Sequence, residues 1–237
     1  MIEKINLNNI LFLDIETVPE YHNYRGLDSE TQQLWEQKTQ YQRKDEVSAE
    51  DFYERAGIWA EFGKIITISV GYFVNKGDIR NFRVTSFWGD EKKILNDFSN
   101  LLNTHFNGAQ HVLCGHNAKE FDIPFIARRM IIKGIALPNK LNLFGKKPWE
   151  VPHLDTLELW KFGDYKHFTS LKLLTKVLGI PSPKDDIDGS EVAHVFYVED
   201  NIDRIITYCE KDVIAVAQIF LRLRREDLLI DDEIIHV

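Results

Sequence analysis

Cysteine, proline and long apolar runs are all scarce in this chain. Its 237 residues include only two cysteines, Cys114 and Cys209, and seven prolines. The two cysteines are too few for a disulfide framework and too far apart for a CxxC zinc pair. No apolar run approaches the roughly 18 residues of a membrane span, and the opening MIEKINLNNI lacks the basic and apolar regions of a signal peptide. We therefore expect a soluble protein of the reducing cytoplasm, without a membrane partner.

Repeats and Gly/Ser- or Pro-rich linkers are also missing from the sequence. With 44% hydrophobic and 28% charged residues, the chain can bury a substantial core. We expect a single domain over residues 1–237 that carries a helical insertion at about 24–62. The acidic stretch Asp231–Glu233 fits either a partner contact or a solvated segment, and we expect it to be solvated.

Positive charge is in short supply, since 29 Lys and Arg face 37 Asp and Glu, for a net charge of −8. That balance argues against a nucleic-acid partner, because phosphate contacts need cations. The distribution weakens the argument: residues 113–184 carry 12 basic and 6 acidic side chains, against 12 and 17 in residues 1–112 and 5 and 14 in residues 185–237. Lysines and aromatic residues alternate in this middle segment: Lys140, Lys146, Lys147, Trp149, Trp160, Lys161, Lys166, Phe168 and Lys172. They fit either a track for a phosphate backbone or an ordinary solvated face.

Segments with strand and helix patterns alternate along the chain, which is typical of an α/β fold. The expected strands are 10–14, 65–73, 79–87 and 112–115. The expected helices are 29–42, 48–61, 90–106, 123–133, 169–178 and 201–224. Asn75-Lys76-Gly77 predicts a hairpin between the second and third strands, so the sheet has at least one antiparallel pair and is mixed.

The first candidate motif is Leu13-Asp14-Ile15-Glu16-Thr17, where an apolar run ends in two carboxylates. Because side chains alternate along a strand, Asp14 and Glu16 share one face, separated by roughly 6.6 Å of backbone. Two carboxylates at this spacing can share divalent cations, and at the end of a buried strand they are costly without a partner. Asp-x-Glu also begins at positions 28 and 231. Only the first copy ends a buried strand, and this context favours a metal site there.

Two later motifs carry further acids. Gly115–Phe125 reads GHNAKEFDIPF, a strand end followed by a polar turn and a helix start. Asp122 lies near the N-terminus of that helix, where capping and the helix dipole alone can explain an acid. Tyr208 and Asp212 are four residues apart at the margin of an apolar helical stripe, where a border tyrosine beside a solvated acid is the ordinary alternative.

Taken together, the three motifs resemble the DEDD superfamily of 3′–5′ exonucleases. Tyr208 places the resemblance in the DEDDy branch, since none of the eight histidines is followed five residues later by Asp. The motifs Asp-Ile-Glu-Thr and His-Asn-x-x-x-Phe-Asp-x-Pro-Phe are most similar to those of the exonuclease domain of family B DNA polymerases. The whole chain resembles stand-alone predicted exonucleases related to that domain. The stretch 184–189 adds to this resemblance.

The resemblance implies a ribonuclease H-like fold, with a five-stranded mixed sheet flanked by helices. It also implies two divalent cations, Mg²⁺ or Mn²⁺, held by oxygen ligands alone. Asp14 would bridge both cations. Glu16 and Asp212 would complete one site, and Asp122 would hold the second.

The remaining site residues follow from the same resemblance. Tyr208 would orient the attacking water, because a phenol with a pKa of about 10 is a poor base at neutral pH. Thr17, Asn117 and Phe121 would bind the terminal nucleotide. For Asp155, an additional buried acid, we expect a structural role.

The implied activity is hydrolysis of phosphodiester bonds at DNA 3′ ends, with single-stranded DNA favoured. A chain of 237 residues has no room for the palm, fingers and thumb of a polymerase, so it would trim or edit, for example in DNA repair. The sequence identifies no polymerase or repair partner. A 3′-end-processing ribonuclease remains an alternative. A non-catalytic nucleic-acid-binding module is a further one, although the presence of all four acids argues against it.

Overall fold

The computed structural model describes residues 2–43, 47–77, 79–164, 166–181 and 187–237. Its strands are β1 (Ile10–Pro19), β2 (Gly63–Lys76), β3 (Ile79–Trp88), β4 (Val112–Gly115), β5 (Leu154–Asp155) and β6 (Ile234–His236). Its α-helices are α1 (Ser29–Thr39), α2 (Ala49–Phe52), α3 (Glu91–Thr104), α4 (Asp122–Ile132), α5 (Thr156–Lys161), α6 (Leu171–Val177), α7 (Val192–Tyr197) and α8 (Ile202–Leu223). Short 3₁₀ helices cover Ile2–Lys4, Leu7–Asn9, Tyr24–Gly26, Tyr53–Ile58, Pro148–Glu150 and Asp231–Glu233. No helix of these described residues is long and apolar enough to cross a membrane.

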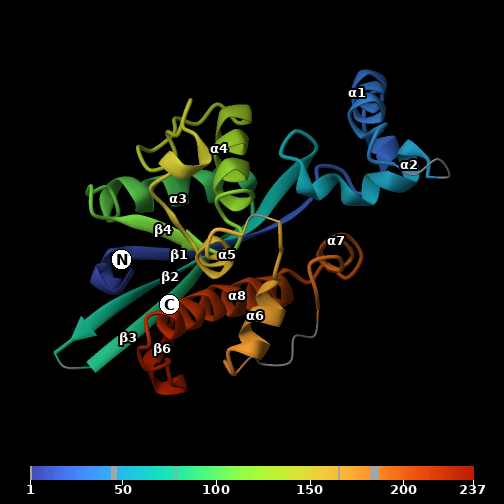
Figure 1. The fold of residues 1–237 in the computed structure, drawn as a ribbon. Coiled ribbons are helices and arrows are strands. Elements are labelled where there is room, and N and C mark those ends of the chain that lie inside the picture. Colours follow the sequence, from blue (N-terminus) through green and yellow to red (C-terminus); the bar gives the residue numbers. More distant parts are fainter. Residues whose placement is uncertain (1, 44–46, 78, 165, 182–186) are drawn as a thin grey trace.

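The strands form one mixed sheet in the order β5-β4-β1-β2-β3-β6, with helices on both faces (Figure 1). The β1–β2 and β2–β3 pairs are antiparallel, and the other three pairs are parallel. The expected mixed α/β sheet is confirmed, including the hairpin between β2 and β3. The expected count of five strands is wrong, because β6 adds a sixth strand beside β3.

Strand β6 follows directly on the acidic stretch that we expected to be solvated. Glu233 accepts hydrogen bonds from Arg80 on β3, at 3.0 Å from Nε and 2.9 Å from Nη2. The Arg80 guanidinium also donates to the carbonyl oxygens of Asp227 and Leu228. The expectation is therefore wrong for Glu233, which joins the C-terminal segment to the sheet.

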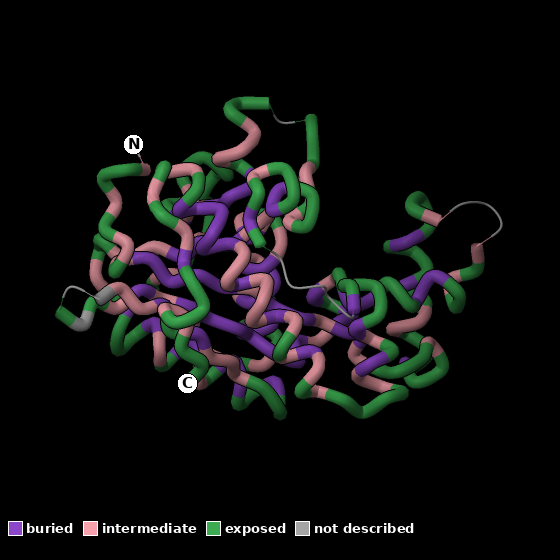
Figure 2. Tube along the Cα trace, turned by 90° about the horizontal axis from the view of Figure 1, so that it is seen from below, coloured by how far each residue is buried: buried purple, intermediate pink, exposed green. Residues whose placement is uncertain are grey.

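Alternation along β1 divides its side chains between the two layers of the core. Leu11, Leu13 and Ile15 pack into the cluster that contains Phe98 of α3 and Phe125 of α4. Ile10 and Phe12 pack on the other face, with Val213 and Phe220 of α8. Figure 2 shows the buried strands running through the middle of the molecule. By the same alternation Asp14 and Glu16 face the α8 layer.

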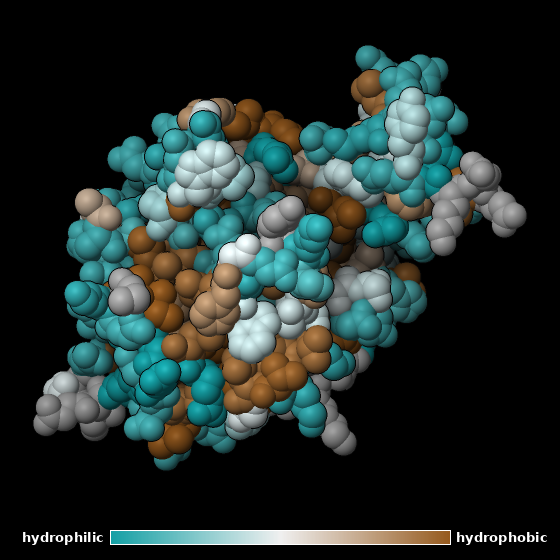
Figure 3. Space-filling model, viewed as in Figure 1, coloured by the Kyte–Doolittle hydropathy of each residue, from teal (hydrophilic) through white to brown (hydrophobic). Residues whose placement is uncertain are grey.

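The insertion projects from the body as a largely hydrophilic lobe that contains α1 and α2 (Figures 1 and 3). Trp35 is fully buried in its own apolar cluster, which also includes Phe52 and Tyr53. The expected helix at 48–61 is wrong beyond its first turn, because the chain continues as the 3₁₀ helix Tyr53–Ile58. Gly57 lies within that 3₁₀ helix, against β1: a Cβ built on it would be 3.1 Å from the carbonyl carbon of Val18. The close crossing and the low helix propensity of glycine both disfavour a regular helix here.

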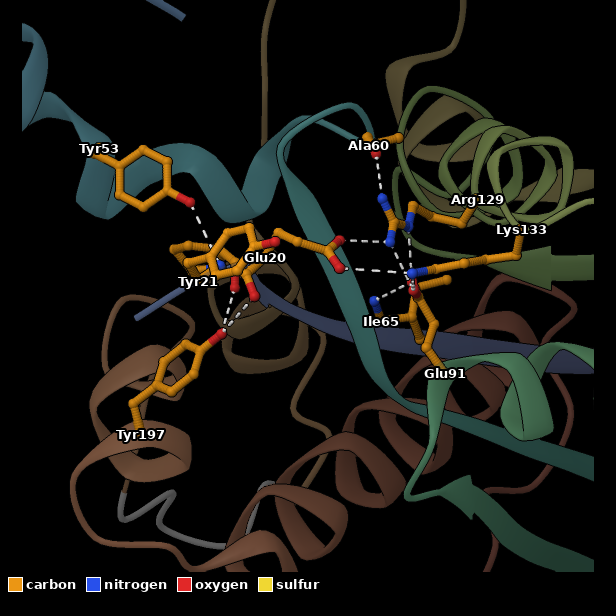
Figure 4. A network of polar contacts seen from close by, with 10 residues as sticks. Glu20, Tyr21, Tyr53, Ala60, Ile65, Glu91, Arg129, Lys133 and Tyr197 are labelled. Carbon is orange, nitrogen blue, oxygen red and sulfur yellow. Dashed lines mark hydrogen bonds and ion pairs between the residues drawn. The ribbon is translucent and has the colours of Figure 1, made fainter. Parts of the chain in front are cut away.

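A buried ion-pair network fixes the far end of β1 (Figure 4). Arg129 of α4 is 2% exposed and donates to Glu91 from Nε at 2.7 Å and from Nη2 at 2.6 Å. The same guanidinium donates to Glu20 Oε2 at 2.6 Å and to the carbonyl oxygen of Ala60 at 2.9 Å. Burial alone raises the pKa of Glu91, but Arg129, together with the Ile65 N–H and the Lys133 ammonium, outweighs this effect and lowers the pKa. The network thus joins the end of β1 to α3, to α4 and to the last residues of the insertion.

We expect Arg129→Met to destabilise the protein by about 3–5 kcal/mol, because it leaves Glu91 buried without its main partner. Urea unfolding followed by circular dichroism measures the loss. The matched control is Lys93→Ala, which removes an exposed i,i+4 pair with Asp97 and should cost less than about 0.5 kcal/mol. Equal effects of the two substitutions would contradict the role of the network.

Candidate active site

The fold brings acids from β1 and α4 together. Strand β4 pairs with β1 only as far as Phe12, so the backbone N–H of Ile15 lies beyond the end of β4. Asp122, the first residue of α4, accepts a hydrogen bond from that N–H at 3.1 Å. Its carboxylate is therefore fixed against the backbone between Asp14 and Glu16. This contact goes beyond the simple capping role that the sequence left open for Asp122.

Helix α8 closes the site from the other side. Cys209 is fully buried and its thiol donates to Asp14 Oδ2 at 3.3 Å. Three atoms that could bind a metal ion lie within 4.8 Å of one another, one each from Asp14, Glu16 and Cys209. Asp212, one turn further along α8, is near enough for its charge to raise the pKa of both Asp14 and Glu16. The close approach of α8 to the sheet depends on Gly71 of β2, where a Cβ would lie 2.8 Å from Val213 Cγ1.

Burial and mutual repulsion perturb the carboxylates of this acid cluster, which comprises Asp14, Glu16, Asp122 and Asp212. Burial, followed by the charges of the other three acids, raises the pKa of Asp14 well above its usual range. Burial and then the charges of Asp212 and Asp122 do the same to Glu16. Burial raises the pKa of Asp122 to about 7, although the N–H of Ile15 lowers it. In the described part of the chain, no salt bridge reaches Asp14, Glu16 or Asp122.

The residues of the acid cluster fit divalent cations. Their donors are carboxylate oxygens, which suit Mg²⁺ or Mn²⁺, and cations would offset the charge that now perturbs them. Thr67, the cross-strand neighbour of Glu16, has a buried hydroxyl with no hydrogen-bond partner among the described residues. Cys209 lies beside these oxygens, but burial raises the pKa of its thiol, which donates to Asp14, and a soft sulfur ligand is not one that Mg²⁺ prefers.

Of the other expected site residues, two line a cleft beside this cluster and two lie on neighbouring elements. Tyr208 is half-buried on α8, one turn before Asp212. Thr17 and Phe121 line a cleft that Glu16 also borders. The hydroxyl of Thr17 already donates to the carbonyl oxygen of Gly57 at 2.8 Å. Asn117, with a φ of 63°, occupies the turn before α4 and is not among the residues that line this cleft.

Asp155 has the contacts of a structural acid. Its Oδ1 accepts from the backbone N–H groups of Asn117 and Leu157, each at 2.9 Å, and its Oδ2 accepts from that of Lys119 at 3.0 Å. It therefore caps α5 and fixes the turn before α4 at the same time. Sequence reasoning missed a second support for this turn: the ring of His116 contacts Thr156 Oγ1 at 2.9 Å and the carbonyl oxygen of Thr169 at 2.8 Å. Its only sequence signal is its place beside Asn117.

In the middle basic segment, residues 113–184, some of the lysines and aromatic residues are exposed and others have contacts within the fold. Trp149 and Phe168 are strongly exposed, and Lys147 lies over the Trp149 ring at 5.3 Å from its centre. Lys140, in contrast, donates to the carbonyl oxygens of Gly108 and His111. Trp160 packs against a buried apolar cluster. Lys140 and Trp160 therefore have structural contacts and are not free to form part of a track for a phosphate backbone. Of the stretch 184–189, residues 184–186 lie outside the described residues.

We expect Mg²⁺ to stabilise the folded protein, because it relieves repulsion that exists only when the acids are close together. At a concentration of 100 Kd the gain is about 2.7 kcal/mol, which corresponds to a melting temperature several degrees higher. Asp14→Asn should abolish this shift. NaCl at matched ionic strength is the control, and an equal shift with NaCl would show general screening in place of a specific site.

Without divalent cations, we expect stability to fall as the pH rises from about 4 to about 7. The pKa of Asp122 is about 7 in the folded protein against an ordinary value of 3.8, so between these values only the folded state keeps the proton. The loss is of the order of 4 kcal/mol for this group when the pH exceeds both values. Urea unfolding in EDTA across this range measures it. Asp122→Asn should flatten the profile, and an unchanged slope in that variant would contradict the assignment.

The comparisons with known proteins agree with these observations. A family model described as a predicted 3′–5′ exonuclease related to the exonuclease domain of PolB matches residues 58–233. That stretch includes Asp122, Tyr208 and Asp212, whereas β1 and most of the insertion precede it. No curated protein matches the chain.

Among solved structures, the chain is similar to the family B DNA polymerase from the hyperthermophilic archaeon Pyrobaculum calidifontis, with a TM-score of 0.53 and 14% sequence identity. The similarity covers 90% of this chain and 24% of the polymerase chain. It confirms the expected ribonuclease H-like fold of the polymerase exonuclease domain. Since the family model matches well over half of the chain, the protein belongs to the family of predicted 3′–5′ exonucleases related to the exonuclease domain of PolB.

Proposed function

We propose that the protein is a DEDDy-type exonuclease that uses two divalent cations to release nucleotides from DNA 3′ ends. The convergence of Asp14, Glu16, Asp122 and Asp212 is the observation that carries this proposal. Three separate elements bring these acids together at a cost in repulsion, and the described part of the chain provides no salt bridge to the first three. A purely structural site would not need such an arrangement.

Bound Mg²⁺ or Mn²⁺ would supply activation of water and neutralisation of the charge that develops on the phosphate. Asp14 and Glu16 would hold the cations from the strand, and Asp122 and Asp212 would hold them from the two helices. The Cys209 thiol keeps one oxygen of Asp14 in a hydrogen bond and so fixes the orientation of that carboxylate. Rigid elements support all these groups, as phosphodiester hydrolysis at a cation site requires.

Tyr208 would hydrogen-bond to the attacking water, and the terminal nucleotide would lie against Phe121 and Thr17. Phe121 offers a half-buried ring beside Glu16 for stacking with the terminal base. Asn117 would reach the nucleotide from the turn that Asp155 and His116 hold. We also propose that residues 1–237 act as a single domain, with the insertion as part of its substrate-binding surface.

Purified protein should release mononucleotides from single-stranded DNA labelled near its 5′ end when Mg²⁺ or Mn²⁺ is present, and should do nothing in EDTA. Asp14→Ala should lower the rate by at least about two orders of magnitude. Tyr208→Phe should lower it by about a hundredfold, with binding unchanged. Denaturing gels of the time course measure both effects.

Asp203→Asn is the control, since this exposed acid lies on α8 near the start of the helix. It should retain the full rate. Product formation that survives in Asp14→Ala would refute the proposal. A matched RNA oligonucleotide decides between DNA and RNA, and faster loss of RNA would replace the proposed substrate with RNA while leaving the chemistry intact.

A further inference from the structure

A cleft of about 950 Å³ opens beside Glu16, between the insertion and α7. Its floor is the end of β1, from Ile15 to Pro19. One wall is the 3₁₀ segment that contains Arg55 and Ile58, and the other is formed by α7 with Tyr197 and Val198. Both walls lie in the part of the chain where the sequence offered no functional assignment. The cleft is continuous with the acid cluster, because Glu16 belongs to both.

Hydrogen bonds to the end of β1 hold the two walls in place. Thr17 Oγ1 donates to the carbonyl oxygen of Gly57 at 2.8 Å, which fixes the insertion wall. Tyr197 donates through its hydroxyl to the carbonyl oxygens of Pro19 at 2.6 Å and Glu20 at 3.2 Å, which fixes α7 (Figure 4). Glu20 is itself held by Arg129. The cleft is therefore built on rigid anchors and is formed before a ligand binds.

The lining of the cleft combines rings, apolar side chains and few charges. The His22 ring stacks on Tyr197, with ring centres 4.9 Å apart and planes 15° apart. Ile58 and Val198 face it from the two walls, with 48% and 57% of their surface exposed. Such surfaces suit the flat faces of nucleic-acid bases. A duplex hides those faces, so only an unpaired strand can use them.

Arg55 is the permanent cation of the lining. Its guanidinium lies 5.4 Å from the centre of the Phe52 ring, and in the described part of the chain it forms no salt bridge. Glu54 and Glu16 are the acids of the same lining, and the second imidazole, His194, lies 3.9 Å from Glu199. With one permanent cation against two acids in its lining, the cleft is suited to a single phosphate contact at Arg55 and to stacking, in contrast to a broad electrostatic groove.

We propose that this cleft binds the unpaired nucleotides just upstream of the 3′ terminus, with a phosphate on Arg55 and a base stacked on His22. The proposal rests on the proposed function, because it assigns the cleft to the strand whose end lies at the acid cluster. It makes the insertion the element that selects single strands. Arg55 and His22 determine specificity and do not take part in the hydrolysis.

Binding in EDTA tests the proposal without hydrolysis. Fluorescence anisotropy of a 5′-fluorescein ten-residue oligo(dT) gives Kd at several salt concentrations. Arg55→Ala should weaken binding about three- to tenfold and lower the slope of log K against log salt by about 0.7, as the loss of one phosphate contact on a single strand requires. His22→Ala should weaken binding by about fivefold or more at an unchanged slope. A blunt duplex of the same length should bind at least about tenfold more weakly than the single strand.

Arg25→Ala is the matched control, because it removes one cation of the same insertion that is not among the residues lining the cleft. Its Kd and salt slope should equal those of the wild type. Wild-type binding by both Arg55→Ala and His22→Ala would overturn the inference, as would tighter binding of the duplex. Failure of the proposed function looks different: Mg²⁺ then yields no products, although the single strand still binds through Arg55.

Discussion

Repulsion among four carboxylates gathered at one end of the sheet, two of them buried and two half-buried, is the constraint on which the rest of the structure depends. Burial of the two apolar clusters on either side of β1 opposes it. A fully buried Leu, Ile or Phe contributes about 1.5–3 kcal/mol, and each cluster contains more than ten buried residues. The cost of a carboxylate whose pKa is raised by about three units is of the order of 4 kcal/mol. The packing of these two clusters holds the acids together against their mutual repulsion.

The acids of β1 and the acid just after its end are stabilised in opposite ways. Glu20 receives the guanidinium of Arg129 and the ammonium of Lys133. Asp14 and Glu16, only a few residues earlier, receive no salt bridge from the described residues. The chain thus neutralises Glu20, as it does the buried Glu91, where the acid has a structural role. This contrast separates the acids that stabilise the fold from those to which we assign a chemical role.

Long periodic segments were predictable from the sequence, and short ones were not. Helices α3 and α8, the β2–β3 hairpin and the face shared by Asp14 and Glu16 all follow from apolar spacing. Helices α5 and α7 have six residues each and β5 has two, too few to show a period. The acids of the site could be found from their motifs. Arg129 and Glu20 are 109 positions apart in the sequence, and Thr17 and Gly57 are 40 apart. A local sequence pattern cannot predict contacts between residues at such separations. The cleft depends on such contacts and was not predictable for that reason.

Strand β6 also affects the edge of the sheet that would otherwise be open to pairing with a strand of another molecule. Without it, β3 would be an edge strand of ten residues with a free row of backbone donors and acceptors. Val237 extends the cover, since its N–H donates to Val84 and its carbonyl oxygen accepts from Thr85. The opposite edge, β5, has only two residues. The C-terminal segment thus covers β3 from Phe82 to Thr85 and the other edge is too short to template an incoming strand, so both edges disfavour pairing with another sheet.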